Sequence, residues 1–240
     1  MQSRIVKSNK HIILKKLTYR TYLEIEAINT DKDIPDVDKA LYTVCSVYGL
    51  TEQQLDSKGW KKVEKMVTKV ENIFKRKFNL VKKNLIGRYK INYDIENISF
   101  GQYIELAYFF QFNTTDKANY VLASVSKTLF KTTHITRADY FMNRRADYVL
   151  GSYIEIKRLY NEFNKKFSSL FSLDQDVYTA EEINHPFNKR YGWIYSAKTI
   201  AIMNNVSLDE VYKFPVKRAL NDLQYLKEEG KYMSLICKKR

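Results

Sequence analysis

The chain has 240 residues, of which 45% are hydrophobic and 14% aromatic, so it has enough apolar area for a packed core and is not a wholly disordered protein. Its formal net charge of +14 favours an anionic partner, namely nucleic acid, an acidic protein surface or anionic lipid, although a lysine-covered surface with no binding role gives the same balance. The two cysteines, Cys45 and Cys237, exclude a disulfide scaffold, and no apolar run approaches the ~20 residues that a membrane-crossing helix needs.

The N-terminal part of the chain predicts a series of helices after a basic arm. A first helix opens within "LTYRTYLEIEAI", residues 17–28, where Thr18 is suited to the N-cap position. A second helix starts near Asp36 and ends at Gly49, and Thr51 caps a short third helix.

A long amphipathic helix follows. Its apolar stripe has alternating spacings of three and four residues and consists of Trp60, Val63, Val67, Val70 and Phe74. The other faces carry most of the ten Lys and Arg residues between positions 58 and 83. This helix is therefore the element expected to contact DNA phosphates, if the protein binds DNA.

The stretch "GRYKINYDIENISF", residues 87–100, interrupts the helical pattern. Tyr89, Ile91 and Tyr93 alternate with polar residues, which is the period of a strand. We expect one small β element near residues 88–96. The low content of glycine and proline, seven and three residues, favours helices joined by short loops for the rest of the chain.

The helix opener at residues 17–28 has a second copy in "ISFGQYIELAYFF", which starts at Ile98. When Leu17 is aligned with Ile98, Tyr22 and Glu24 fall on Tyr103 and Glu105. A helix, a long amphipathic helix and a similar aromatic-basic ending follow each copy. We expect 17–78 and 98–167 to be superposable helical units; chance similarity between two helix starts is the alternative.

The C-terminal segment predicts three further helices. "SLDE" at residues 207–210 has the pattern of a capping box, and Pro215 suits the first position of the last helix. Trp193, Phe214, Leu220 and Leu223 are expected to anchor the packing of the last two helices.

Together these patterns predict a mainly α protein, a helical bundle of two related helical units and a C-terminal helical segment. The expected domains are residues 1–86, 87–170 and 171–240. No catalytic, cofactor-binding or metal site is expected, and hence no enzyme, because the three histidines are scattered and no nucleophile–base pair or glycine-rich phosphate loop occurs.

Two stretches of the second half carry a resemblance to a known family. One is "ISFGQYIELAYFF" with the later "DKANYVLASVSKTLF", and the other is "RYGWIYSAKTIAIMNNVSLDEVYKFPVKRALNDLQYLK", residues 190–227. They resemble the small proteins of the tail assembly chaperone group of tailed bacteriophages. The matching positions are Tyr191, Gly192, Trp193, Val211, Pro215, Leu220, Leu223, Tyr225 and Leu226. The Lys-, Asn- and Tyr-rich composition is similar to that of phages infecting Bacteroidetes, including the crAss-like phages.

The resemblance implies a virion structural protein, such as a tail hub or a ring subunit at the portal–tail junction, made in the host cytoplasm and retained in the tail. The alternatives are a non-virion chaperone that binds tail-tube or tape-measure protein, and a non-specific DNA-binding protein. Expected partners are other tail or portal-proximal proteins, further copies in a homo-oligomeric ring, and packaged DNA. The residues expected to form the structural and interface contacts are Tyr22, Glu24, Trp60, Tyr103, Glu105, Trp193, Phe214, Pro215, Leu220 and Leu223.

Overall fold

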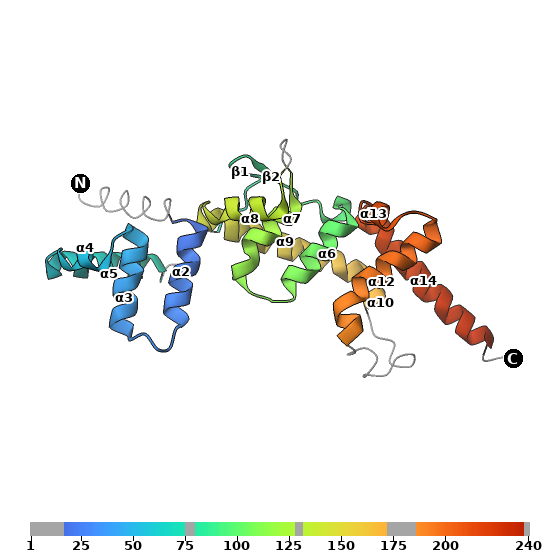
Figure 1. Cartoon of the computed structure of the whole chain (residues 1–240), viewed down its shortest axis with the longest axis horizontal. Coiled ribbons are helices and arrows are strands. Elements are labelled where there is room, and N and C mark those ends of the chain that lie inside the picture. Colours follow the sequence, from blue (N-terminus) through green and yellow to red (C-terminus); the bar gives the residue numbers. More distant parts are fainter. Residues whose placement is uncertain (1–16, 75–79, 128–131, 172–185, 238–240) are drawn as a thin grey trace. The chain divides into compact units, whose positions relative to one another are not determined.

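The computed structural model describes residues 17–74, 80–127, 132–171 and 186–237 (Figure 1). Contacts divide the chain into two compact units, and each unit is built from two stretches of sequence. Unit 1 comprises Met1–Ile91 and Thr115–Ile154, and unit 2 comprises Asn92–Thr114 and Glu155–Arg240. The long helix α9 (Ala146–Lys166) therefore contributes its first half to unit 1 and its second half to unit 2. The domain borders expected near residues 86 and 170 stay a prediction.

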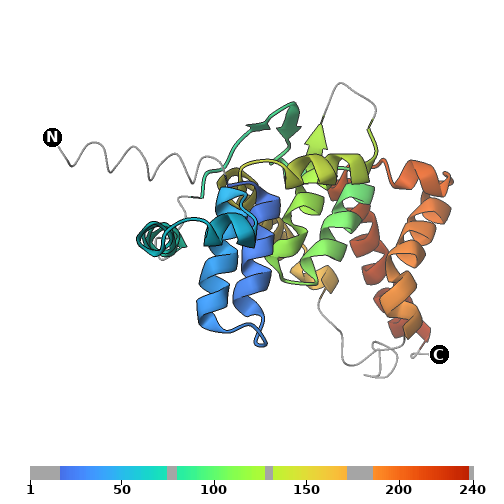
Figure 2. The same ribbon diagram turned by 60° about the vertical axis from the view of Figure 1, so that its left-hand side comes forward.

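Four helices form the first part of unit 1. They are α2 (Tyr19–Thr30), α3 (Asp36–Tyr48), α4 (Glu52–Asp56) and α5 (Trp60–Phe74). The side chain of Thr18 caps α2 by accepting a hydrogen bond from Thr21 N–H, and Thr51 caps α4 in the same way. Gly49 ends α3 in the left-handed conformation, with φ 64°, which glycine adopts without steric cost. α2 and α3 lie side by side (Figure 2).

The apolar stripe of α5 packs against α3 and α4. The buried members of this core are Val44, Leu55, Val63 and Val70, and Val67 packs against them. Trp60 departs from the predicted stripe, because its side chain is 70% exposed. It is the first residue of α5, and burial along this helix begins only one turn later, at Val63.

Unit 1 also contains a small antiparallel sheet. Its strands, in the order β1-β2-β3, are β1 (Leu85–Ile86), β2 (Tyr89–Ile91) and β3 (Ser126–Lys127). The mainly helical fold with one small β element is thereby confirmed. The strands begin slightly before the expected position, because the turn lies at Gly87, whose φ is 61°. The third strand has only two residues, too few to produce an alternating pattern in the sequence.

The remaining elements of unit 1 are the 3-10 turn η2 (Thr115–Lys117), α7 (Ala118–Val125), α8 (His134–Met142) and the first half of α9. Every residue of α7 except Tyr120 is buried. The buried Tyr19 hydroxyl donates a hydrogen bond to the Thr115 carbonyl and accepts one from Ala118 N–H (3.2 Å). Burial raises the pKa of Tyr19 above its usual value, so the hydroxyl stays neutral. Its two hydrogen bonds join α2 to η2 and to the start of α7.

The described part of unit 2 is almost entirely helical. Besides the second half of α9 it contains η1 (Ile95–Asn97), α6 (Phe100–Phe110), α10 (Ser168–Phe171), α12 (Pro186–Asn204), α13 (Leu208–Val211) and α14 (Val216–Cys237). The capping box predicted at Ser207 and Glu210 is confirmed, and Ser99 with Gln102 forms another before α6. Pro215 immediately precedes α14. No helix in the described ranges is long and apolar enough to cross a membrane.

In each unit a short antiparallel backbone bridge joins the starts of two helices. In unit 1 an antiparallel bridge pairs Thr18, the cap of α2, with Arg145, the residue before α9. In unit 2 the equivalent bridge pairs Ser99, the cap of α6, with Pro215 before α14. In unit 1, Tyr19 N–H donates to Arg144 O (2.7 Å) and Ala146 N–H donates to Leu17 O (2.9 Å). In unit 2, Phe100 N–H donates to Phe214 O (2.8 Å) and Val216 N–H donates to Ile98 O (2.9 Å).

The two copies of the helix opener thus make the same kind of contact. Tyr19 and Phe100, at aligned positions, are both fully buried. The pairs named from the sequence are less alike, because Tyr22 is half-buried where Tyr103 is buried, and Glu24 is exposed where Glu105 is half-buried. The shared feature is the bridge, which links α2 to α9 in unit 1 and α6 to α14 in unit 2. The comparison of the two sequence copies did not include these helix pairs. The superposition of 17–78 on 98–167 stays a prediction.

Helix α9 carries a glycine where another backbone segment crosses it closely. Val81 N–H donates to the Asp147 carbonyl (3.2 Å), and Lys83 N–H donates to Ser152 Oγ (3.2 Å). A Cβ atom at Gly151 would lie 2.5 Å from Val81 N and 2.7 Å from Val81 C. Because these are backbone atoms, the segment has no side chain that could rotate away.

We expect Gly151→Ala to lower the free energy of unfolding by about 1–3 kcal/mol through overpacking. The same change at Gly230 in α14 is the control, since no atom lies within 4 Å of the added methyl group. Gly230→Ala is expected to stabilise the protein by up to about 1 kcal/mol through helix propensity. Urea unfolding measures both values, and equal effects would contradict the close approach at Val81.

Candidate interaction surface

Helix α12 has one apolar side packed into unit 2. Ala197 and Ile200 are fully buried. The half-buried Trp193 ring meets Phe100 edge-on at a centroid distance of 6.0 Å, and Tyr103 at 5.7 Å. Trp193 therefore anchors α12 on α6, whereas the sequence placed it between the last two helices.

The opposite side of α12 is exposed and carries apolar residues on either side of Lys198. Tyr195 is 66% and Ile202 81% exposed, and Tyr191 lies one turn before Tyr195 on the same side. Soluble helices with one buried side normally carry polar residues on the other. This second stripe, Tyr191, Tyr195 and Ile202, is a candidate contact surface, here called the α12 stripe.

Helix α14 is packed only over its first half. Val216, Ala219 and Leu220 are fully buried, and Leu223 is half-buried. The side-chain amine of Lys227 donates to the carbonyl of Ser169 (2.6 Å) in α10. All residues from 228 to 237 are exposed, so the core of the described part of unit 2 does not extend along the second half of the helix.

The unpacked half of α14 nevertheless has an apolar face. Tyr232, Met233 and Ile236, with Tyr225 just before this half, fall within one arc of the helix, since successive residues turn by about 100°. The arc also contains Glu229, which accepts a hydrogen bond from the Tyr225 hydroxyl (3.2 Å). This arc, here called the α14 face, is turned by roughly half a circle from the side that Val216 and Leu220 bury. Leu235, which is also exposed, lies outside the arc. The α14 face is therefore a second candidate contact surface and not a continuation of the core.

The interior of unit 2 beneath α12 is aromatic. The Tyr103 ring lies 5.4 Å from Tyr160 and 6.1 Å from Phe163, and its hydroxyl donates to Asn164 Oδ1 (2.9 Å). Burial raises the pKa of both tyrosines, that of Tyr103 most, which keeps the two hydroxyls neutral. Edge-on rings of this kind fix the orientation of the helices that carry them, and so position the α12 stripe.

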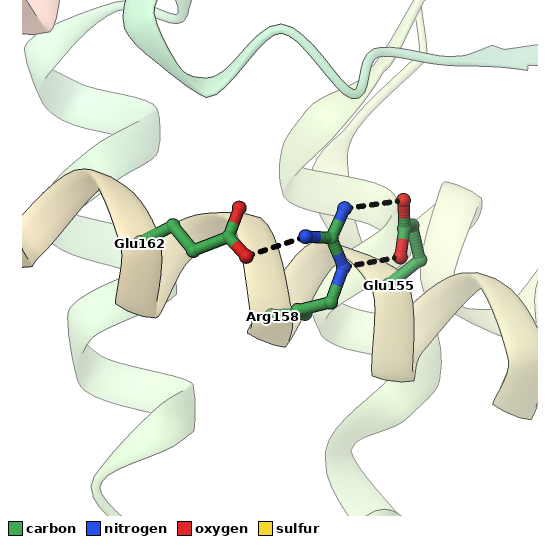
Figure 3. Close-up of polar contacts among 3 residues, drawn as sticks. All are labelled: Glu155, Arg158 and Glu162. Carbon is green, nitrogen blue, oxygen red and sulfur yellow. Dashed lines mark hydrogen bonds and ion pairs between the residues drawn. The ribbon is translucent and has the colours of Figure 1, made fainter.

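Charges on the exposed side of α9 are paired within the helix (Figure 3). The Arg158 guanidinium donates to both carboxylate oxygens of Glu155 (2.8 and 2.9 Å) and to Glu162 (2.5 Å). The hydrogen bonds to Glu155 and then Glu162 raise the pKa of Arg158. Each of these three charges therefore has its partner about one turn away in the same helix.

Several residues singled out from the sequence lie apart from these surfaces. Tyr22 is half-buried, and burial followed by the charge of Glu26 raises its pKa. Glu24 and Trp60 are exposed in unit 1. Phe214 is half-buried under the Arg218 guanidinium, 3.8 Å from its ring centroid, while Pro215 is exposed. Leu220 is core, as expected, and Glu105 is half-buried.

Two features of the described residues bear on metal binding and catalysis. Among them no group of three or more His, Cys, Asp or Glu side chains could hold a metal ion. A cavity between α3 and α5 is lined by Asp36, Lys39, Thr43 and Glu71, and Lys39 pairs with Asp36 at 3.7 Å. This lining supplies charge but no activated nucleophile.

The two tryptophans provide a matched test of which ring supports the fold. Trp193→Ala is expected to lower the free energy of unfolding by about 2–3 kcal/mol, somewhat less than the loss of a fully buried ring. Trp60→Ala is expected to change it by less than about 0.5 kcal/mol, as for other exposed side chains. Chemical unfolding of both variants gives the comparison, and a stable Trp193→Ala would contradict the packing of α12 on α6.

Comparison with known proteins assigns no family to the chain. No family model matches it. No curated protein and no solved structure is significantly similar to it. The surfaces described above and the resemblance in residues 97–227 are therefore the observations from which a function is argued.

Proposed function

We propose that the protein is a virion structural protein of a tailed bacteriophage, a hub or ring subunit of the tail or portal–tail junction that acts through protein–protein packing. The observation that carries this proposal is the α14 face. A helix of 22 residues keeps its last ten in solvent although they include Tyr232, Met233 and Ile236. Tyrosine and methionine are enriched at protein interfaces, and exposed apolar patches commonly mark them.

A helical segment without packing is marginal on its own. Ten residues are fewer than an isolated helix needs for stability in water, so contact with a neighbour would stabilise the second half of α14. Burying a side chain such as Tyr232 or Ile236 contributes roughly 1.5–3 kcal/mol. The free energy gained when several such side chains are buried in an interface is therefore of the size needed to hold subunits together.

Further copies of the chain are the proposed neighbours. Unit 2 has two different apolar surfaces, the α12 stripe and the α14 face. A ring requires a head-to-tail contact between two unlike patches, whereas a two-fold dimer uses one patch twice. The pair of surfaces supports a homo-oligomeric ring, with other tail or portal-proximal proteins as the next neighbours.

The placement in a phage particle is supported by the resemblance of residues 97–227. Trp193 and Leu220, two of its matching positions, contribute to the packing of unit 2. Mass spectrometry of density-purified particles is the test, with a host ribosomal protein as the contamination control. Recovery of the protein in fixed stoichiometry supports a virion role. Its absence from particles, with binding to tail-tube or tape-measure protein in infected cells, would establish the assembly chaperone instead.

Assembly through the α14 face is tested in the purified protein. The triple variant Tyr232→Ser, Met233→Ser, Ile236→Ser should shift the oligomer to monomer in sedimentation velocity while leaving the melting temperature within a few degrees, because these side chains are exposed in the subunit. Leu235→Ser is the matched control, an apolar-to-polar change on the same helix outside the arc, and should keep the oligomer. An unchanged oligomer in the triple variant would exclude this face from the contact.

A further inference from the structure

Two lysines of unit 1 lie directly opposite each other on neighbouring strands. The register pairs Lys90 of β2 with Lys127 of β3, and both side chains are exposed on the outward face of the sheet. Like charges in this position destabilise an antiparallel pair. Lysine on an edge strand discourages edge-to-edge aggregation, which explains Lys127 but not Lys90, because β2 is the central strand.

The hairpin that carries Lys90 is held in place at its tip. Its turn is Gly87–Arg88, and Arg88 N–H donates to the hydroxyl of Tyr140 (3.1 Å). A Cβ atom at Gly87 would lie 1.9 Å from that hydroxyl, so the turn rests directly on Tyr140. The Arg88 guanidinium lies 4.9 Å from the Tyr140 ring centroid and 5.3 Å from that of Tyr89. The charge of Arg88 is thereby fixed relative to the sheet.

A second guanidinium shares the same ring. Arg144 lies 3.8 Å from the Tyr140 centroid, and its Nε is buried without a hydrogen-bond partner. In contrast, the neighbouring Arg145 is paired with Asp147 (2.5 Å). Within the described residues, no carboxylate pairs with Lys90, Lys127, Arg88 or Arg144. These four residues, here called the hairpin cations, carry four positive charges that the fold itself does not neutralise.

We propose that the hairpin cations bind the phosphodiester backbone of double-stranded DNA. Phosphates would relieve the repulsion between Lys90 and Lys127 and pair with charges that no carboxylate of the described residues neutralises. An acidic protein partner would add an apolar anchor to the charges, and Tyr89 and Tyr140 are not available for this because Tyr89 is buried and Tyr140 lies beneath two guanidiniums. The exposed Leu85, opposite Lys90, is the one apolar side chain beside them in the register of the sheet, so competition by polyglutamate is included in the test. The same covered rings are not available to stack on unpaired bases, so the duplex is favoured over a single strand.

This inference is independent of the proposed assembly role and differs from the sequence expectation, which placed DNA contact on the basic helix at 58–83. The cations of α5 lie on a helix whose charges are spread over several faces. The hairpin cations come from β2, β3, the hairpin turn and the residues before α9, and aromatic rings order two of them. Sequence spacing alone gives no sign that Lys90 lies opposite Lys127, or that Arg88 and Arg144 share the Tyr140 ring.

The test is fluorescence anisotropy of the full chain with a labelled 20-base-pair duplex of arbitrary sequence, titrated between about 50 and 200 mM salt. The parent should bind with a linear dependence of log affinity on log salt. Lys90→Ser with Lys127→Ser should weaken binding by about three- to tenfold and reduce the slope by about one to two, since each lost phosphate contact removes roughly 0.9.

A charge reversal separates binding from folding. Lys127→Glu should weaken DNA binding yet raise the melting temperature, because it converts a repulsive cross-strand pair into an attractive one. Lys61→Glu, an equal change of net charge at an exposed position of α5, is the control and should reduce affinity less. The proposal is overturned if both reversals weaken binding equally, if Lys127→Glu binds like the parent, or if polyglutamate competes for the parent more strongly than unlabelled duplex.

Discussion

The fold depends on two backbone bridges, each of which ties the start of a short helix to the start of a long one. The bridge at Thr18 and Arg145 holds α2 against the beginning of α9, and the bridge at Ser99 and Pro215 does the same for α6 and α14. Each bridge also satisfies N–H groups at helix N-termini, which have no partner within their own helix. The neighbouring side chains, Tyr19 and Phe100, fill the core directly behind.

Local patterns in the sequence predicted much of the helical structure. The stripe at Val63 and Val70 and the capping box at Ser207 depend on residues within two turns of each other, and both are present. Trp60 fits the same period but lies before the turn where α5 meets its neighbours, so spacing alone misplaced it. Trp193 was expected to pack, but its partner α6 could not be named, because contact across about ninety residues leaves no periodic trace.

The candidate surfaces were harder to predict than the core. The sequence contains the apolar residues of the α12 stripe and the α14 face, but it does not show which side of each helix the rest of the unit covers. Apolar residues on two sides of one helix can be recognised from their spacing, and Tyr195 and Ile202 could have been identified as surface residues in this way. The opposition of Lys90 and Lys127 needed the strand register, which a two-residue strand does not reveal.

The bridges also set the order in which the chain can fold as it is synthesised. Leu17 cannot receive its hydrogen bond from Ala146 until the ribosome has made the long stretch of chain between them, and Ile98 must likewise wait for Val216. Such distant pairing slows folding and leaves apolar surface uncovered in the meantime. The nascent chain therefore holds α2 and α6 without their final neighbours while the intervening residues are made, and protection by chaperones matters most in this interval.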